Sequence, residues 1–192
     1  DNIFTCIKDG KIHYDNVRDS LTIHNYPSCP FDIKKKIKSI DIDKIIIKDS
    51  ATKPIVIPCR LENGFPIRLL YKNENIRNDQ IMMNIIKIAK LILEKNTNDD
   101  FYIITYNVFP NSETSGIIEV VDSSDTIYSI EQHSKIRISN YIFNNNSNQT
   151  VSDIRKKFIK STAFYSIISY LFGIGDRHLD NIMIKKSGEL FH

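Results

Sequence analysis

The most informative segment of the chain reads Gly173-Ile174-Gly175-Asp176-Arg177-His178-Leu179-Asp180-Asn181. Its two glycines end a helical pattern, a polar cluster follows, and the apolar run Ile182-Met183-Ile184 then predicts a strand. A carboxylate, an imidazole and an amide that lie this close together on a loop can accept a proton, stabilise charge and bind a cation. The plainer alternative is a polar turn whose side chains only cap the backbone.

Two long helices are predicted from apolar residues that recur at helical spacing. The first contains Ile81, Ile85, Ile88 and Ile92; Asn78 or Asp79 is a candidate cap, and residues 96–98 mark its end. The second covers residues 151–172. Its expected inward stripe consists of Ile154, Phe158, Thr162, Tyr165, Ser169 and Phe172.

Short apolar runs separated by turn-forming residues predict antiparallel strands before and after the first helix. The runs cover residues 45–47, 55–57, 67–71, 101–108 and 116–121, and residues 111–115 are the expected hairpin connection. Residues 140–149 are predicted to be an exposed polar loop, and residues 189–192 to open a returning strand. The pattern as a whole predicts an α+β fold.

Composition excludes several classes of protein. The chain has 192 residues, of which 26% are charged and 41% hydrophobic, which suits a soluble domain with a buried core. A formal net charge of +3 is too small for a typical nucleic-acid-binding surface. Cys6, Cys29 and Cys59 form neither a disulfide framework nor a zinc motif, so a reducing compartment is expected. No apolar run reaches the roughly 18 to 20 residues of a membrane span.

The segment 173–184 resembles the catalytic loop of the phosphoinositide 3-kinase family, in which the kinase order His-Arg-Asp runs as Asp-Arg-His. This resemblance implies that Asp176 and His178 help to take the proton from the attacking hydroxyl group. It also implies that Arg177 braces the loop and that Asn181 binds a metal ion. Phosphoryl transfer depends mainly on positioning and charge neutralisation, and these residue types supply part of each.

Upstream segments resemble the nucleotide-binding part of the same family. Residues 49–57 are similar to its phosphate-binding loop, in which Ser50 would meet the ATP phosphates. Lys72 occupies the place of the ATP-contacting lysine, and an ammonium group at the end of an apolar strand requires an anion if it is buried. Residues 77–80 resemble the family's Arg-Gln-Asp segment, so Asp79 would line the back of the nucleotide pocket.

The segment that follows the first helix resembles the family's inner pocket and hinge. Tyr106 matches the inner tyrosine, and Gly116-Ile117-Ile118-Glu119-Val120-Val121 matches the hinge at the family's spacing. The resemblance implies that the Glu119 carbonyl and the Val121 amide pair with the adenine edge and that Ile118 is the gatekeeper. A plain core strand is the alternative for this run.

The resemblance implies a protein-kinase-like fold with an antiparallel β N-lobe containing one helix, a hinge and the start of a helical C-lobe. The expected boundaries are 1–42 for a preceding linker, 43–121 for the N-lobe through the hinge and 122–192 for a partial C-lobe. The chain is expected to stop before the Asp-Phe-Gly motif, so the isolated piece should be inactive. Missing C-lobe partners should leave apolar residues exposed on the helix from residue 151 and the strand from residue 182.

The implied activity is ATP-dependent phosphorylation of the inositol ring of a phosphatidylinositol lipid, with Mg²⁺ or Mn²⁺. The hinge resembles that of classes I and II, whereas Leu179-Asp180 resembles class III. The implied setting is a cytoplasmic protein at a membrane surface, with a possible regulatory subunit and without nucleic acid. A protein Ser/Thr kinase of the related group and a non-catalytic nucleotide-binding relative stay open as alternatives.

Overall fold

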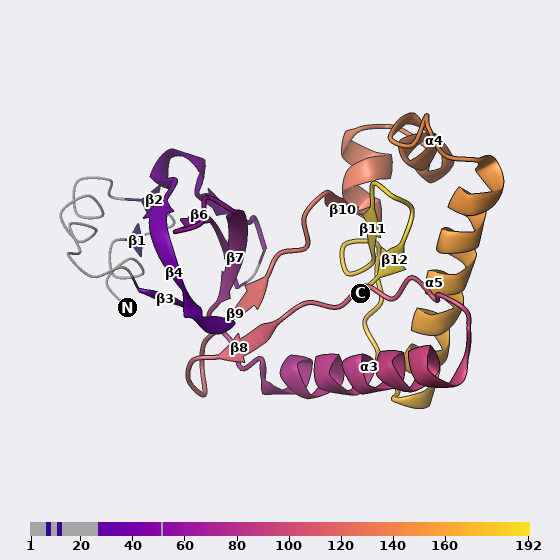
Figure 1. Cartoon of the computed structure of the whole chain (residues 1–192). Helices are drawn as coiled ribbons and strands as arrows, with labels where there is room; N and C mark the ends of the chain where they lie inside the picture. Colours follow the sequence, from indigo (N-terminus) through magenta and orange to yellow (C-terminus); the bar gives the residue numbers. More distant parts are fainter. Residues whose placement is uncertain (1–6, 9–10, 13–26, 51) are drawn as a thin grey trace. The chain divides into compact units, whose positions relative to one another are not determined.

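The protein is described by a computed structural model that covers residues 7–8, 11–12, 27–50 and 52–192. The chain forms two compact units. The first consists of Asp1–Met83 and Tyr106–Val120, and the second of Asn84–Thr105 and Val121–His192. Both units contain a sheet and helical segments, in agreement with the predicted α+β, kinase-like class (Figure 1).

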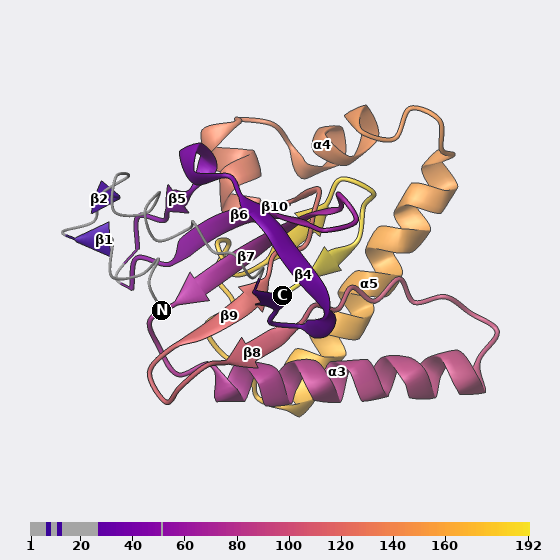
Figure 2. The same ribbon diagram turned by 60° about the vertical axis from the view of Figure 1, so that its left-hand side comes forward.

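The first unit contains a seven-stranded, strongly curled antiparallel sheet with the order β3-β4-β6-β7-β9-β8, and β5 pairs with β6 (Figure 2). Its strands are β3 Ser28–Cys29, β4 Asp32–Ile40, β5 Ile46–Ile47, β6 Ile55–Leu61, β7 Pro66–Lys72, β8 Val108–Pro110 and β9 Gly116–Glu119. A separate hairpin joins β1 Ile7–Lys8 to β2 Lys11–Ile12. The short helix η1 covers Ile42–Lys44. Strand β4 lies within residues 1–42 and pairs with β6, so the sheet extends into the expected linker.

The core of the first unit forms around β6, because this strand has neighbours on both sides. Ile55, Val56, Ile57, Cys59 and Leu61 are all buried, which is typical of a central strand. Their partners include Cys29, Ile37 and Leu69. Burial, together with the nearby Cys29, raises the pKa of the Cys59 thiol to about 12, so this cysteine is an unreactive core residue. Cys29 and Cys59 are free thiols, and Cys6 lies outside the described residues.

The first predicted helix is confirmed as α3, Arg77–Asn96. Its first turn is capped by Asn75, whose Oδ1 accepts the Arg77 N–H at 3.1 Å, so the expectation of a cap at Asn78 or Asp79 was wrong. The helix buries Met83 and Ile86. The periodic isoleucines that predicted the helix include three that are more than half exposed: Ile81, Ile88 and Ile92. The helix is therefore apolar on two faces.

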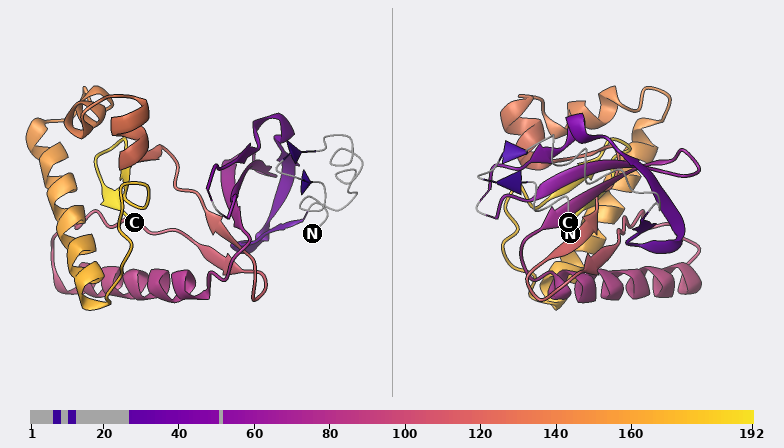
Figure 3. Two further views of the ribbon diagram at one scale, coloured as in Figure 1. Left: turned by 180° about the vertical axis from the view of Figure 1, so that it is seen from behind. Right: turned by 90° about the vertical axis from the view of Figure 1, so that its left-hand side faces the viewer.

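The second unit contains a three-stranded antiparallel sheet with the order β10-β11-β12 (Figure 3). Its elements are β10 Ser124–Thr126, the π-helical turn η2 Ser129–His133, α4 Ile138–Asn144, α5 Val151–Leu171, β11 Met183–Lys185 and β12 Leu190–Phe191. Helix α5 packs against β12, where Ser161 Oγ accepts the Leu190 N–H at 2.9 Å. The predicted returning strand near the end of the chain is confirmed as β12.

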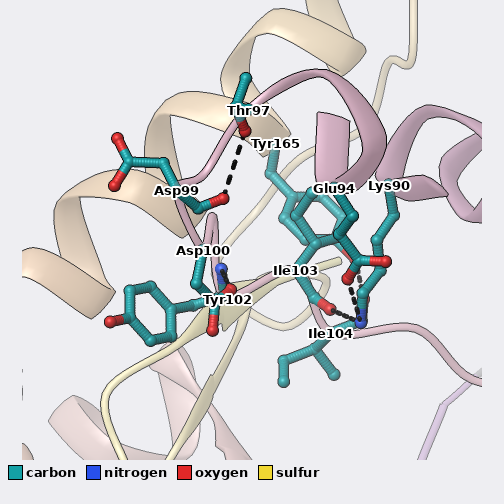
Figure 4. A network of polar contacts seen from close by, with 9 residues as sticks. All are labelled: Lys90, Glu94, Thr97, Asp99, Asp100, Tyr102, Ile103, Ile104 and Tyr165. Atoms are coloured by element: carbon teal, nitrogen blue, oxygen red, sulfur yellow. Dashed lines mark hydrogen bonds and ion pairs between the residues drawn. The ribbon is translucent and has the colours of Figure 1, made fainter. Parts of the chain in front are cut away.

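The prediction of a strand over residues 101–108 was wrong except at its end, where β8 begins at Val108. The carbonyl groups of Ile103 and Ile104, in the middle of this segment, bond to side chains. Lys90 Nζ donates to Ile103 O at 3.1 Å, and the Tyr165 hydroxyl donates to Ile104 O (Figure 4). Lys160 lies 2.7 Å from Asp99 Oδ1 at the start of the segment. These tertiary contacts override the strand propensity of the isoleucines.

The prediction of an exposed loop over residues 140–149 was also wrong in part, because α4 extends to Asn144. Tyr141 and Ile142 are buried. The Asn146 amide is buried as well and donates to Ile142 O at 2.7 Å and Lys186 O at 2.5 Å. An asparagine that satisfies carbonyl groups in this way ends a helix and does not mark a solvated tract.

The second predicted helix is confirmed as α5, and Thr150 caps it by accepting the Asp153 N–H at 3.1 Å. The expected inward stripe was wrong in part. Ile154 and Tyr165 are buried, whereas Phe172 lies beyond the helix and is exposed. The full set of buried α5 residues is Ile154, Ser161, Phe164, Tyr165 and Ile168.

The expectation of exposed apolar surface on α5 is confirmed: Ile159, Ile167, Tyr170 and Leu171 are each more than half exposed. The same expectation was wrong for the strand from residue 182. Ile184 is fully buried because β11 pairs with β10 on one side and β12 on the other.

Candidate active site

The predicted catalytic loop follows α5 and is confirmed as a segment without regular structure. Gly173 has φ 58° and Asp176 has φ 52°. The left-handed region suits glycine, and aspartate is one of the few other residues that enter it readily. Asn181 Nδ2 donates to the Asp176 carbonyl at 2.7 Å and thereby closes the loop. The sequence therefore folds into a loop held by its own polar residues.

The loop brings Asp176, His178 and Asn181 together. His178 Nε2 lies 3.9 Å from Asp176 Oδ1 and 3.1 Å from Asn181 Nδ2. The other ring nitrogen, Nδ1, accepts the Asp180 N–H at 3.2 Å. One nitrogen of the imidazole is thus held by the backbone, and the other lies beside a carboxylate. Because Nδ1 accepts a hydrogen bond, the neutral imidazole carries its proton on Nε2, on the side of the carboxylate, where it can stabilise the charge of Asp176.

Asn181 can supply one oxygen ligand to a metal ion. Its hydrogen bond to the Asp176 carbonyl uses Nδ2, which leaves the amide oxygen Oδ1 for a cation. Among the described residues, no group of three or more His, Cys, Asp or Glu side chains is placed to hold a metal. The loop therefore fits a cation that completes its coordination with waters and substrate phosphates, as Mg²⁺ usually does.

Arg177 belongs to this loop, and His192 lies near it. Arg177 Nε donates to Gly175 O at 2.8 Å, in keeping with a bracing role. The His192 ring lies 5.1 Å from the Tyr165 ring, and its Nδ1 lies 3.2 Å from Ser169 Oγ. Burial, and to a smaller degree the Arg177 charge, lowers the pKa of His192 to about 4. Sequence reasoning missed His192 because a single histidine outside a motif gives no signal.

Lys72 has the anion that its position requires. Its Nζ lies 2.6 Å from Glu74 Oε1, and 26% of the lysine side chain is exposed. The partner comes from the turn after β7, two residues further on. Sequence reasoning missed Glu74 as an ion-pair partner, although a Lys-x-Glu spacing at a strand end is a signal that can be searched for.

Ser50 and Asp79 are exposed in the structure. Ser50 lies in a turn in which its amide donates to Lys48 O at 3.1 Å and its carbonyl accepts the Lys53 N–H at 3.0 Å. Lys53 has φ 43°, a conformation that a tight turn requires. Asp79 lies in the first turn of α3. Their predicted contacts with ATP stay predictions.

Strand pairing places the predicted hinge beside the lysine strand. In the register of β7 and β9, Lys72 faces Gly116 and Leu70 faces Ile118. Ile118 also pairs with Val108 of β8, so it lies in the middle of three strands. Gly116 is required here because an added Cβ would lie 2.2 Å from the Cδ1 atom of Ile76, which is fully buried.

Glu119 ends β9, and its carboxylate accepts hydrogen bonds from Asn107. Asn107 directly follows Tyr106, which is half-buried. The Val120 N–H then donates to Arg68 O at 2.9 Å. The division between the two compact units falls between Val120 and Val121, inside the predicted hinge. Val121 O accepts the Ser124 hydroxyl at 2.7 Å.

The predicted site residues therefore divide between the two units. The first unit contains Ser50, Lys72, Asp79, Tyr106, Ile118 and Glu119. The second contains Val121, Asp176, Arg177, His178 and Asn181. Polar contacts bring Asp176, His178 and Asn181 together in the second unit, and β-pairing brings the strands of Lys72 and Ile118 together in the first.

The family model for phosphatidylinositol 3- and 4-kinase matches residues 66–192, from β7 through the loop to the last residue. The chain belongs to this family. It is 29% identical over 167 residues to the phosphatidylinositol 3-kinase VPS34 of Candida glabrata, covering 85% of this chain and 19% of that protein. It is 27% identical over 197 residues to the phosphatidylinositol 3-kinase pik3 of Schizosaccharomyces pombe, covering 97% and 23% respectively.

The chain thus spans about a fifth of the length of these curated relatives. Membership of a kinase family implies the use of ATP together with a divalent metal ion. In the described part of the chain, none of the helices combines the length and the apolar character that a membrane span requires.

Proposed function

We propose that this chain is the nucleotide-binding and catalytic-loop part of a phosphatidylinositol 3-kinase. The reaction transfers the γ-phosphoryl group of ATP to a hydroxyl group of the inositol ring of a phosphatidylinositol lipid. The observation that carries the proposal is the grouping of Asp176, His178 and Asn181 on one self-bonded loop within the segment that matches the family. The names of both relatives support the 3-kinase class.

The proton of the attacking hydroxyl passes to the Asp176 carboxylate, with the help of the neighbouring His178. The new bond joins the hydroxyl oxygen to the γ-phosphorus, and the bond between that phosphorus and the β–γ bridging oxygen breaks. His178 would help because its Nδ1 accepts the Asp180 N–H, so that the neutral ring carries its proton on Nε2, which lies 3.9 Å from Asp176 Oδ1. Arg177 holds the loop through the Gly175 carbonyl.

Asn181 would bind Mg²⁺ or Mn²⁺ through Oδ1, and the metal supplies neutralisation of phosphate charge. Lys72 would add positive charge at the phosphates, with Glu74 holding its ammonium group in place. Ser50 would contact the phosphates from its turn, and Asp79 and Tyr106 would line the inner pocket. The Glu119 carbonyl and the Val121 amide would pair with adenine, beside the gatekeeper Ile118.

The lipid substrate implies action at a membrane surface, with the protein peripheral to the membrane and otherwise cytoplasmic. A regulatory subunit is an additional expected partner. No nucleic-acid partner is proposed, because the net charge of the chain is only +3.

The test uses the complete protein that carries this chain, vesicles containing phosphatidylinositol, and ATP labelled at the γ-phosphate. Asp176→Asn and Lys72→Met should each reduce transfer by on the order of 10²-fold or more. The matched control is Glu113→Gln, since Glu113 is a highly exposed carboxylate on the hairpin between β8 and β9. Wild-type rates in both active-site variants would contradict the site assignment.

The same assay separates the alternatives. Phosphate transfer to Ser/Thr-containing peptides, without transfer to lipid, would identify a protein kinase. ATP binding without transfer to either acceptor would identify a non-catalytic relative.

A further inference from the structure

Asn107 and Glu119 form an unusually complete pair at the end of the hinge strand. The Glu119 carboxylate oxygen Oε2 accepts the Asn107 backbone N–H at 3.0 Å and the Asn107 side-chain amide at 2.7 Å. The Glu119 N–H in turn donates to Asn107 O at 2.8 Å. Both residues are half-buried. Three hydrogen bonds therefore join two residues that are twelve positions apart in the sequence.

The pair lies where the β8–β9 ladder ends. The ladder joins Pro110 to Gly116, Phe109 to Ile117 and Val108 to Ile118. The Asn107–Glu119 pair continues this pairing by one residue toward the hinge, and the next amide, that of Val120, turns to β7. Glu119 is therefore the last hinge residue that is fastened to the β8 side of the sheet.

A half-buried carboxylate depends strongly on such donors. Hydrogen bonds to a charged group stabilise more than neutral ones, and removing the donor leaves a partly desolvated charge without compensation. The backbone of Glu119 is fixed from both ends, through its own N–H and through its side chain. Loss of the Asn107 amide would release the side-chain connection and loosen the carbonyl orientation of the same residue.

We propose that Asn107 is a positioning residue for ATP binding. It sets nucleotide affinity by fixing Glu119 at the end of the hinge strand β9. This inference rests on the proposed function, because it takes the Glu119 carbonyl as an adenine contact. Asn107 also directly follows Tyr106, so the same three hydrogen bonds hold the backbone next to this predicted inner pocket residue. Asn107 acts through Glu119 and Tyr106 and does not itself touch the reacting atoms.

The test exchanges the two polar groups of the pair. Asn107→Asp places a carboxylate against the Glu119 carboxylate and removes the side-chain donor, so KM for ATP should rise by about tenfold or more while kcat changes little. Glu119→Gln replaces the charged acceptor of both Asn107 hydrogen bonds with a neutral amide oxygen and should raise KM by about threefold. In the double variant, the new side-chain amide at position 119 can donate to the new carboxylate at position 107, and its oxygen can accept the backbone N–H. KM for ATP should therefore return to within about twofold of wild type.

A matched control removes hydrogen bonds at the other end of the β8–β9 hairpin. Ser112 Oγ lies 2.8 Å from Ser115 Oγ and accepts the Thr114 N–H at 3.1 Å. Ser112→Ala should lower thermal stability by an amount similar to Glu119→Gln and leave KM for ATP unchanged. A purely structural role of Asn107 would instead give the same KM in all variants, and that result would overturn the inference.

The experiment uses the complete protein and measures ATP binding by calorimetry beside lipid phosphorylation. A double variant whose KM is no better than that of Asn107→Asp would overturn the inference and leave the proposed function standing. If wild type transfers no phosphate to lipid but ATP binding follows the predicted order of variants, the proposed function fails and the inference stands. A wild type that binds no ATP would overturn both.

Discussion

The catalytic loop and the hinge strand are built in opposite ways. In the loop, Asn181 bonds to Asp176 and His178 to Asp180, so the partners of these polar side chains lie within five positions in the sequence. The loop is almost entirely exposed. In the hinge, Glu119 bonds to Asn107 and its strand pairs with β7, whose residues lie about fifty positions earlier. The polar side chains of the loop bond to residues nearby in the sequence, whereas the hinge forms only when strands distant in the sequence pair.

This difference predicts different consequences of substitution. Residues of an exposed, locally bonded loop contribute little to the free energy of unfolding and can be specialised for chemistry. Residues of the hinge sheet contribute to folding and to nucleotide geometry together.

The largest expected effect is a loss of catalytic rate without a loss of stability, on substitution of a loop residue. Asp176→Asn should lower kcat for lipid phosphorylation by about 10²-fold or more, because the proton acceptor is lost. Since the Asp176 side chain is exposed, the melting temperature should change by less than about 2 °C. Steady-state kinetics and calorimetry on the same preparation check this. A large drop in melting temperature would show that the loop is not independent of the core.

The second effect concerns packing beneath the hinge strand. Gly116→Ala adds a Cβ at 2.2 Å from Ile76 Cδ1, so the buried isoleucine must move, at a cost of about 1–3 kcal/mol in the free energy of unfolding. Urea denaturation measures this cost. The double variant with Ile76→Ala provides the control, because its cavity makes room for the new methyl group. If Gly116→Ala destabilises equally in both backgrounds, the contact is not the cause.

A smaller effect links the loop to its neighbouring helix through His192. The pKa of His192 is lowered to about 4 in the folded state, against 6.5 for the ordinary side chain. The unfolded chain therefore binds more protons between these values, and stability falls as the pH is lowered from about 6.5 to 4, by on the order of 1–2 kcal/mol. Above about pH 7 this contribution is fully present.

Unfolding curves of wild type and His192→Gln across this pH range test the prediction. The variant should lose part of the pH dependence, because glutamine does not titrate. Identical pH profiles would exclude His192 as the responsible group.

The smallest effect concerns a local cap at the first helix. Asn75→Ala removes the side-chain acceptor of the Arg77 N–H and should cost about 1 kcal/mol of stability. Asn78→Ala is the matched control, since Asn78 is an exposed residue of the first turn of α3 and alanine has the higher helix propensity. Thermal denaturation of the two variants distinguishes them, and an equal loss would contradict the assignment of the cap.

Local sequence patterns predicted many of the helices and strands. The glycines at 173 and 175 ended α5, the isoleucine spacing predicted α3, and short apolar runs predicted β6, β7 and β9. The predicted catalytic loop was recognisable for the same reason, because its polar residues and the hydrogen bonds between their side chains and the backbone lie within one short segment.

The errors occurred where long-range contacts replaced local preference. Residues 101–107 do not form a strand because Lys90 and Tyr165 bond to their carbonyl groups. Asn146 appeared to belong to a solvated loop, yet its amide is buried against Lys186. Partners of this kind are set by which elements meet, and no periodicity in the chain reports them.

The order of residues along the chain was therefore sufficient for the family, the two long helices and the loop that would carry the chemistry, because each depends on neighbours a few positions apart. Strand order and the contacts between distant residues depended on folding. Ile76 excluded a side chain at Gly116, and Asn107 reached Glu119 only through the pairing of β8 with β9. A hydrogen bond requires two groups within about 3 Å, and distant residues reach that separation only in the folded chain.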